Sequence, residues 1–115
     1  MKNVSFAYPK TDKIILRDLS FTINPGERVA IVGENGAGKS TIIKLICGLY
    51  DPTSGRITMN GTDIATLSHK QLQKVLSVVF QDYANYQMSL REGVAFGNLG
   101  KIHDDKALVN ALKQA

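Results

Sequence analysis

The fold is decided by one stretch of the chain, Gly33-Glu34-Asn35-Gly36-Ala37-Gly38-Lys39-Ser40. It matches the pattern G-x-x-x-x-G-K-[ST], a glycine-rich loop that joins a strand to a helix. Before it, Val29 to Val32 is apolar on both faces, which predicts a strand buried on both sides in a parallel sheet. After it, apolar residues recur at the spacings of three and four that are typical of an amphipathic helix: Ile42, Leu45, Ile46 and Leu49. The sequence therefore predicts a strand–loop–helix unit of an α/β fold.

The residues of this loop suit a ligand that carries several negative charges. A triphosphate is best held by backbone N–H groups that point inward from a loop curled around it. Glycines at 33, 36 and 38 let the backbone approach without Cβ clashes and permit positive φ angles. A helix that begins near Lys39 adds unpaired N–H groups and the positive end of its dipole. We therefore expect Lys39 to contact the β and γ phosphates and the Ser40 hydroxyl to ligate Mg²⁺.

Alternating apolar residues predict strands on both sides of this unit. The segment Val4 to Tyr8 places its larger apolar side chains on one face, as a half-buried strand does. A second alternation runs from Leu19 to Ile23. Farther along, Arg56 to Met59 and Thr62 to Ile64 flank Asn60-Gly61, which is a strong signal for a tight hairpin turn. These patterns predict strands on both sides of the loop, two of them joined as a hairpin.

Helix signals occupy the rest of the chain, with one apolar strand between them. Ser68 with Gln71 three residues later forms a capping-box pattern, which predicts a short helix to about residue 75. Ser77 to Phe80 then reads as a second short apolar strand. Asp104 or Asp105 is placed to cap a final helix that carries Leu108 and Leu112.

Length and composition narrow the possible classes of protein. The 115 residues, of which 43% are hydrophobic, suffice for one domain with a core. The longest apolar run, Val29 to Val32, is too short to span a bilayer, and no secretory signal is visible. A single Cys47 excludes an internal disulfide, and it reads as a small buried side chain rather than a reactive thiol. The net charge of +4 suits a phosphate-bearing partner without requiring nucleic acid.

Taken together, these motifs resemble the nucleotide-binding domain of ATP-binding cassette (ABC) transporters over nearly the whole chain. The loop corresponds to the Walker A motif of that family. The other matching segments are Val4-Ser5-Phe6-Ala7-Tyr8-Pro9, Leu16-Arg17-Asp18-Leu19-Ser20-Phe21, Pro25-Gly26-Glu27, Leu49 to Ile57, Asn60-Gly61, and Ser77-Val78-Val79-Phe80-Gln81-Asp82, which resembles the Q-loop. Ser89-Leu90-Arg91-Glu92 resembles exporter-type members, although Gly93 departs from the asparagine common there.

The resemblance implies ATP and Mg²⁺ as cofactors. It implies that Tyr8 stacks on adenine and that Gln81 contacts Mg²⁺ or the attacking water, so that Ser40 and Gln81 are the expected Mg²⁺ contacts. The residues expected to bind the nucleotide are Tyr8, Gly33, Asn35, Gly36, Ala37, Gly38, Lys39, Ser40 and Thr41. It also implies an ATPase that drives export, located at the cytoplasmic face of the cell membrane. Its partners would be a transmembrane domain, contacted through the Q-loop and Tyr83 to Glu92, and a second nucleotide-binding domain, with no nucleic acid.

Parts of the family pattern do not occur in this sequence. No Leu-Ser-Gly-Gly-Gln-like signature follows Gln81, and no apolar strand ends in Asp-Glu. Residues 1–115 therefore resemble the N-terminal part of one ABC-type ATP-binding domain, truncated before the signature motif and Walker B and incomplete at the C-terminus. The resemblance implies an antiparallel β subdomain, the Walker A unit of a P-loop NTPase and the start of a helical subdomain. We expect this segment alone to be inactive as an ATPase, because no residue is evident to orient the hydrolytic water. We also expect it to be poorly stable, because apolar strand edges would stay open.

Several residues allow a second interpretation from the sequence alone. Tyr8 also reads as a hydrophobic strand end, and Gln81 as an ordinary polar residue after a strand. Asp82 after an apolar stretch also resembles a Walker B carboxylate. The side chains of Tyr83, Tyr86 and Met88 read equally as folded onto their own domain or as a partner surface. For the whole chain, the alternatives are a soluble ABC ATPase without a membrane partner and a non-hydrolysing nucleotide-binding remnant.

Overall fold

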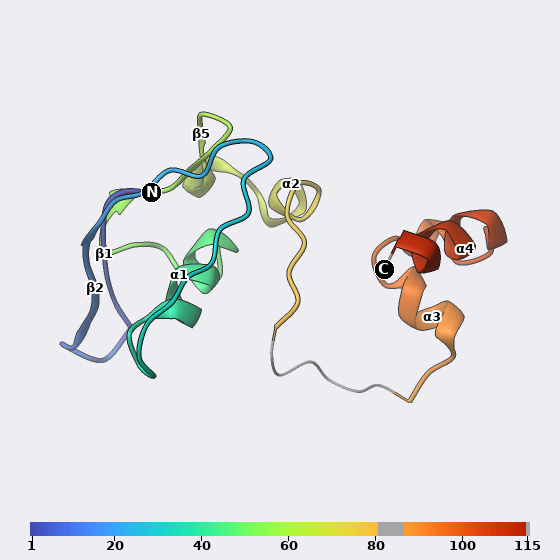
Figure 1. Cartoon of the computed structure of the whole chain (residues 1–115), viewed down its shortest axis with the longest axis horizontal. Coiled ribbons are helices and arrows are strands. Elements are labelled where there is room, and N and C mark those ends of the chain that lie inside the picture. Colours follow the sequence, from blue (N-terminus) through green and yellow to red (C-terminus); the bar gives the residue numbers. More distant parts are fainter. Residues whose placement is uncertain (81–86, 115) are drawn as a thin grey trace. The chain divides into compact units, whose positions relative to one another are not determined.

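The computed structural model describes residues 1–80 and 87–114, which divide into two compact units, Met1–Val78 and Val79–Ala115. The first contains β1 (Lys2–Ala7), β2 (Ile14–Leu19), α1 (Lys39–Ile46), β3 (Ser54–Arg56), β4 (Thr58–Met59), β5 (Thr62–Asp63), the 3₁₀ helix η1 (Ile64–Thr66) and α2 (His69–Gln73) (Figure 1). The second contains α3 (Leu90–Ala95), the 3₁₀ helix η2 (Leu99–Lys101) and α4 (Asp105–Gln114). No helix in the described ranges is long and apolar enough to cross a bilayer.

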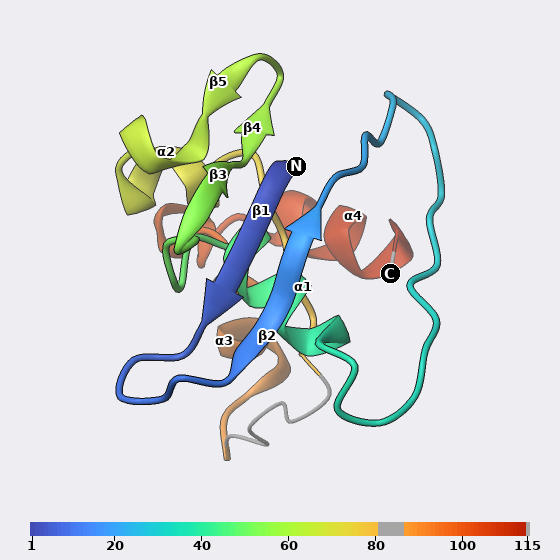
Figure 2. The same cartoon turned by 90° about the vertical axis from the view of Figure 1, so that its left-hand side faces the viewer.

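An antiparallel sheet with the order β2-β1-β3 forms one layer of the first unit (Figure 2). The central strand β1 confirms the strand predicted from Val4. Gly55 of β3 has a φ of 80°, and a Cβ there would collide with the backbone carbonyl of Asn3, so glycine permits the close pairing of β3 with β1. The prediction of a strand from Leu19 to Ile23 is wrong, because β2 ends at Leu19. Beyond it, two backbone hydrogen bonds join Met1 and Phe21: the Phe21 N–H donates to the Met1 carbonyl at 3.1 Å, and the Met1 amino group donates to the Phe21 carbonyl at 2.8 Å.

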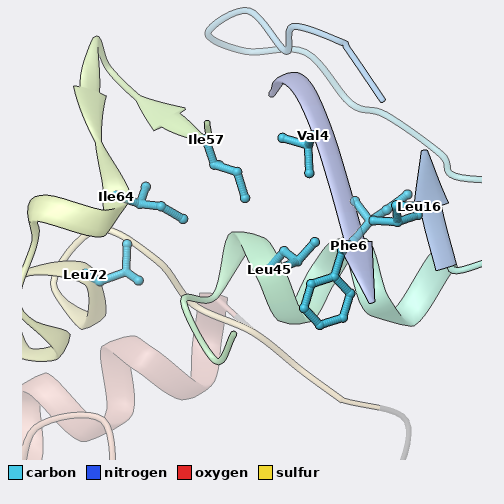
Figure 3. Close-up of a cluster of buried hydrophobic side chains, with 8 residues drawn as sticks. Val4, Phe6, Leu16, Leu45, Ile57, Ile64 and Leu72 are labelled. Atoms are coloured by element: carbon cyan, nitrogen blue, oxygen red, sulfur yellow. The ribbon is translucent and has the colours of Figure 1, made fainter. Parts of the chain in front are cut away.

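Helix α1 packs its apolar side against one face of this sheet (Figures 2 and 3). Its buried residues have the predicted helical spacing, and Leu45 is fully buried. The helix ends earlier than the pattern suggested, since Gly48 adopts a φ of 65° and Leu49 beyond it is 54% exposed. The core has contributions from both layers and from the segments after α1: Val4, Phe6, Leu16, Ile42, Leu45, Ile57, Ile64 and Leu72.

Two local predictions in this unit are confirmed. Strands β4 and β5 pair through the Asn60-Gly61 turn, whose φ angles of 50° and 81° are both positive, as a type I′ hairpin requires. Helix α2 begins with the expected capping box. The Gln71 backbone N–H donates to the Ser68 hydroxyl, and the Ser68 backbone N–H donates to the Gln71 side chain at 2.9 Å.

The described part of the second unit consists of short helices, which capping hydrogen bonds and an ion pair stabilise. Ser89 and Glu92 form a capping box at the start of α3. The S-x-x-E pattern of residues 89–92 is a sequence signal for a helix N-terminus, and it could have predicted α3. The prediction of a final helix is confirmed, with the Asp104 side chain accepting from the Ala107 N–H at 3.0 Å. Arg91 donates to the Ile102 carbonyl at 2.9 Å and pairs with Asp105, so it ties α3 to the start of α4.

Two predicted strands are not formed. Val29 to Val32 lies in the long loop between β2 and α1, and Val32 is 88% exposed instead of buried (Figure 2). Ser77 to Phe80 is likewise irregular, with Val79 exposed. Both predictions are wrong for the same reason, because a strand is held by hydrogen bonds to neighbouring strands. Among residues 1–80 and 87–114, the paired strands are β1 to β5, and none of them pairs with either segment.

Candidate functional site

The glycine-rich loop forms a tight bend just before α1. The Ala37 N–H donates to the Glu34 carbonyl at 3.2 Å, which closes a turn at the tip of the loop. Gly36 and Gly38 have φ angles of 84° and 90°, a region that favours glycine. At Gly38 a Cβ would also lie 2.8 Å from the end of the Leu16 side chain and 3.2 Å from the Ile15 side chain, so the loop end packs closely against β2. Backbone conformation therefore favours glycine at both positions, and the close packing favours it further at Gly38.

The N-terminus of α1 is electropositive. Gly38 occupies the N-cap and has no side chain to satisfy the helix donors. The first intrahelical bond runs from the Ile42 N–H to the Gly38 carbonyl at 3.0 Å, so helix geometry leaves the three preceding N–H groups without intrahelical partners. The first turn contains no acidic residue that would offset the helix dipole. This end of the helix is suited to an anion.

The Lys39 side chain lies across the loop that precedes it. Its Nζ donates to the carbonyl oxygens of Gly33 at 2.7 Å and Glu34 at 2.6 Å. An ammonium group has three donors, so one is left over by these two bonds. The positive charge is therefore held beside the loop backbone, next to the N-terminus of α1, where a phosphate would meet both.

Tyr8, expected to stack on adenine, lies beside this helix. Its hydroxyl is 3.1 Å from the hydroxyl of Thr41, a residue 33 positions away in the chain. The Tyr8 ring also makes edge-to-face contacts with Phe6 and Tyr50, at centroid distances of 5.0 and 5.2 Å. The Lys44 Nζ lies 5.7 Å from the centre of the same ring. The fold therefore brings Tyr8 and Thr41 together, and no spacing rule in the sequence could have revealed that contact.

The remaining predicted site residues divide into those the structure describes and those it does not. Asn35 is exposed in the loop, and Ser40 is exposed in the first turn of α1, where its hydroxyl is a hard oxygen ligand of the kind Mg²⁺ prefers. Gln81 lies outside the described residues, as do the other Q-loop and aromatic candidates Asp82, Tyr83 and Tyr86. Met88 is described and partly buried.

Cys47 caps the C-terminal end of α1 and is partly buried. Burial raises the pKa of its thiol, because desolvation disfavours the thiolate. The thiol is therefore a poor nucleophile at neutral pH, as expected, although Cys47 is only partly buried and not the buried side chain that the sequence predicted.

In the described residues, a glycine-rich bend and a lysine therefore lie together at a helix N-terminus. Comparison with known proteins identifies the family to which the chain belongs. A model of the family described as ABC transporter matches residues 16–115 of the chain. The chain belongs to the ABC transporter family, and it carries part of an ABC ATPase domain, which has the P-loop NTPase fold.

Individual relatives cover nearly all of this chain. The subtilin transport ATP-binding protein SpaT of Bacillus subtilis is 40% identical over 111 residues, which are 96% of this chain and 18% of SpaT. The Beta-(1-->2)glucan export ATP-binding/permease protein NdvA of Brucella suis is 39% identical over 103 residues, 90% of this chain and 17% of NdvA. A solved structure of a bacterial Atm1-family ABC exporter with ATP bound matches with a TM-score of 0.78 and 43% identity, over 84% of this chain and 17% of that one. The chain thus spans less than a fifth of the length of these proteins.

Proposed function

We propose that this chain is the N-terminal part of the ATP-binding domain of an ABC exporter, and that residues 33–41 bind the phosphates of Mg²⁺-ATP. The observation that carries the proposal is the Lys39 ammonium, held against the loop carbonyls beside an uncapped helix N-terminus. Positive charge and free backbone donors converge there, as an anion site requires. The ATP bound to the similar Atm1-family exporter supports the choice of ligand.

Each residue of the loop has a role in this proposal. The backbone N–H groups of the loop and of the first turn of α1 donate to phosphate oxygens, and Lys39 turns its remaining donor toward the terminal phosphates. Ser40, and Gln81 outside the described residues, would hold Mg²⁺, which neutralises phosphate charge when bound. The residues proposed to contact the phosphates are Gly33, Asn35, Gly36, Ala37, Gly38, Lys39, Ser40 and Thr41.

Tyr8 is proposed to supply the platform for adenine. An adenine ring has an apolar face and a polar edge, so an aromatic side chain is its natural partner, and stacking contributes about 0.5–1.5 kcal/mol. The position of Tyr8 beside α1, with its hydroxyl on Thr41, supports this role because base and phosphates would be held by one helix.

The export function is proposed for the whole protein of which this chain is a part. One relative is named for subtilin transport and another for glucan export, which favours export over a soluble ATPase or a non-hydrolysing remnant. The proposed partners are a transmembrane domain, contacted through residues 83–92, and a second ATP-binding domain, at the cytoplasmic face of a membrane. We propose that the complete domain hydrolyses ATP and that this chain alone binds it without turnover.

Substitution of Lys39 tests the phosphate site. Lys39→Ala is expected to reduce Mg²⁺-ATP affinity about a hundredfold, since a charge-assisted hydrogen bond of roughly 1.5–3 kcal/mol is lost. Isothermal titration of the folded chain measures the effect. Lys70→Ala on α2 is the matched control, because it removes the same charge from an exposed helix away from the loop. An unchanged affinity for Lys39→Ala, or an equal loss for both variants, would refute the proposed site.

A further inference from the structure

We propose that the Thr41 hydroxyl is a positioning group for base recognition, which holds the Tyr8 ring in place and links the adenine platform to the phosphate loop. The inference rests on the proposed function, because it assigns a role to two residues of the same nucleotide site. The juxtaposition that carries it is the 3.1 Å contact between the hydroxyls of Tyr8, just beyond β1, and Thr41, in the first turn of α1.

The burial of Thr41 makes this contact specific. Thr41 is only 5% exposed, and it is the sole polar residue among the buried side chains of the described ranges. A buried hydroxyl is costly to leave without a hydrogen-bond partner, and the partner that the fold supplies is the Tyr8 hydroxyl. The bond therefore constrains the Tyr8 side chain at its far end, where an exposed tyrosine would be free.

The Tyr8 ring is held on its other sides as well. Phe6 meets it at an interplanar angle of 78° and Tyr50 at 90°, which are the edge-to-face arrangements that aromatic pairs prefer. With its ring packed and its hydroxyl bonded, Tyr8 is ordered by the protein itself. A ligand that stacks on an ordered ring loses less conformational entropy on binding than one that must first order it.

The position of Thr41 joins the two halves of the site. Its backbone N–H belongs to the set that helix geometry directs at the phosphates, while its side chain points to Tyr8. A change at the hydroxyl is thus expected to act on the base half and to leave the phosphate half unaltered. That asymmetry separates a positioning role from a purely structural one, which would weaken both halves equally.

A double-mutant cycle on the 115-residue chain tests the link. Thr41→Val keeps the backbone N–H and the side-chain shape but removes the hydroxyl, and Tyr8→Phe removes the same bond from the other side. Each single variant is expected to bind ATP about twofold to tenfold more weakly, because ATP must then order the Tyr8 side chain on binding, with affinity for inorganic tripolyphosphate unchanged. The double variant is expected to be no weaker than the weaker single one. Thr41→Ser, which retains the hydroxyl, is expected to bind ATP like the original chain.

A control variant and two contrary outcomes test the link between Tyr8 and Thr41 independently of the Lys39 experiment. Thr66→Val removes a hydroxyl whose bond, to the Asp63 carbonyl at 2.7 Å, lies away from the loop, and it is expected to change neither affinity. Equal losses for ATP and tripolyphosphate, or fully additive effects of the two substitutions, would overturn the link while the phosphate site stands. If Thr41→Val does not fold, Tyr8→Phe with the two ligands decides the question alone. Absence of ATP binding by the original chain would overturn the proposed function, and the link with it.

Discussion

Two apolar stretches of the first unit behave in opposite ways. In β1, Val4 is fully buried, because β2 and β3 pair with the strand on both sides and α1 covers one face. Between β2 and α1, Val32 is 88% exposed in the segment Val29 to Val32, which is more apolar than β1 but pairs with none of the described strands. The comparison teaches that an apolar pattern predicts which residues are able to be buried, whereas burial itself depends on a partner elsewhere in the chain.

Two glycines with the same φ of 80° offer the largest test of this comparison. A Cβ at Gly55 would collide with the Asn3 backbone within the paired sheet, whereas a Cβ at Gly26, near the unpaired segment, would meet open space. Gly55→Ala is expected to destabilise the fold by about 2–5 kcal/mol, from strain at positive φ plus overpacking. Gly26→Ala is expected to cost only the strain, about 1–2 kcal/mol. Urea unfolding followed by circular dichroism measures both, and equal effects would mean that β3 does not approach β1 as described.

Matched valine substitutions give the next effect in size. Val4→Ala is expected to cost about 2 kcal/mol, from the lost burial of two methyl groups and the cavity they leave. Val32→Ala is expected to lie within about 0.5 kcal/mol of no change, as for most exposed positions. The same urea unfolding curves provide the comparison. A large loss for Val32→Ala would show that the segment from Arg28 to Val32 is buried in solution and would break the contrast drawn above.

The smallest expected effect concerns the two capping boxes, which need no distant partner. The Ser89 hydroxyl and backbone N–H lower the pKa of the Glu92 carboxyl below its ordinary value. A lowered folded-state pKa means that the carboxylate stabilises α3 above the ordinary glutamate pKa of about 4.3 and loses that contribution as the pH falls through the lower folded value. The protection of the α3 amides from hydrogen exchange, relative to unprotected amides at the same pH, is therefore expected to fall below about pH 4.

The control for this pH dependence is present in the chain. In α2 the same box uses Gln71, which does not titrate, so its protection is expected to lack that component. Glu92→Gln should make α3 behave like α2. If α3 of the Glu92→Gln variant still loses protection in the same acid range, the carboxylate is not responsible.

The same contrast explains which features of the fold could be predicted from the sequence alone. The predictions of the Asn60-Gly61 turn and of the capping box at Ser68 are confirmed, because each depends only on interactions between residues close together in the sequence. The glycine-rich loop was predictable for the same reason, since its φ angles and its lysine follow from the motif. The prediction of a strand at Val29 to Val32 is wrong, because the apolar pattern of a segment does not show whether a neighbouring strand is present to pair with it.

The link between Tyr8 and Thr41 shows the same limit at the site. Each residue was singled out separately, but their contact joins positions 33 residues apart and depends on how α1 packs on the sheet. Nothing in the sequence shows that the aromatic residue after β1 and the threonine after the lysine–serine pair lie close together in space. Such contacts become visible only when the fold is known.

The measurement that tests the central claim most directly is an amide NMR titration of the isotope-labelled chain with inorganic tripolyphosphate. The largest shifts are expected on the amides of residues 33–41, because their N–H groups bind the phosphates. Shifts confined to amides outside this loop, or shifts that survive unchanged in Lys39→Ala, would contradict it.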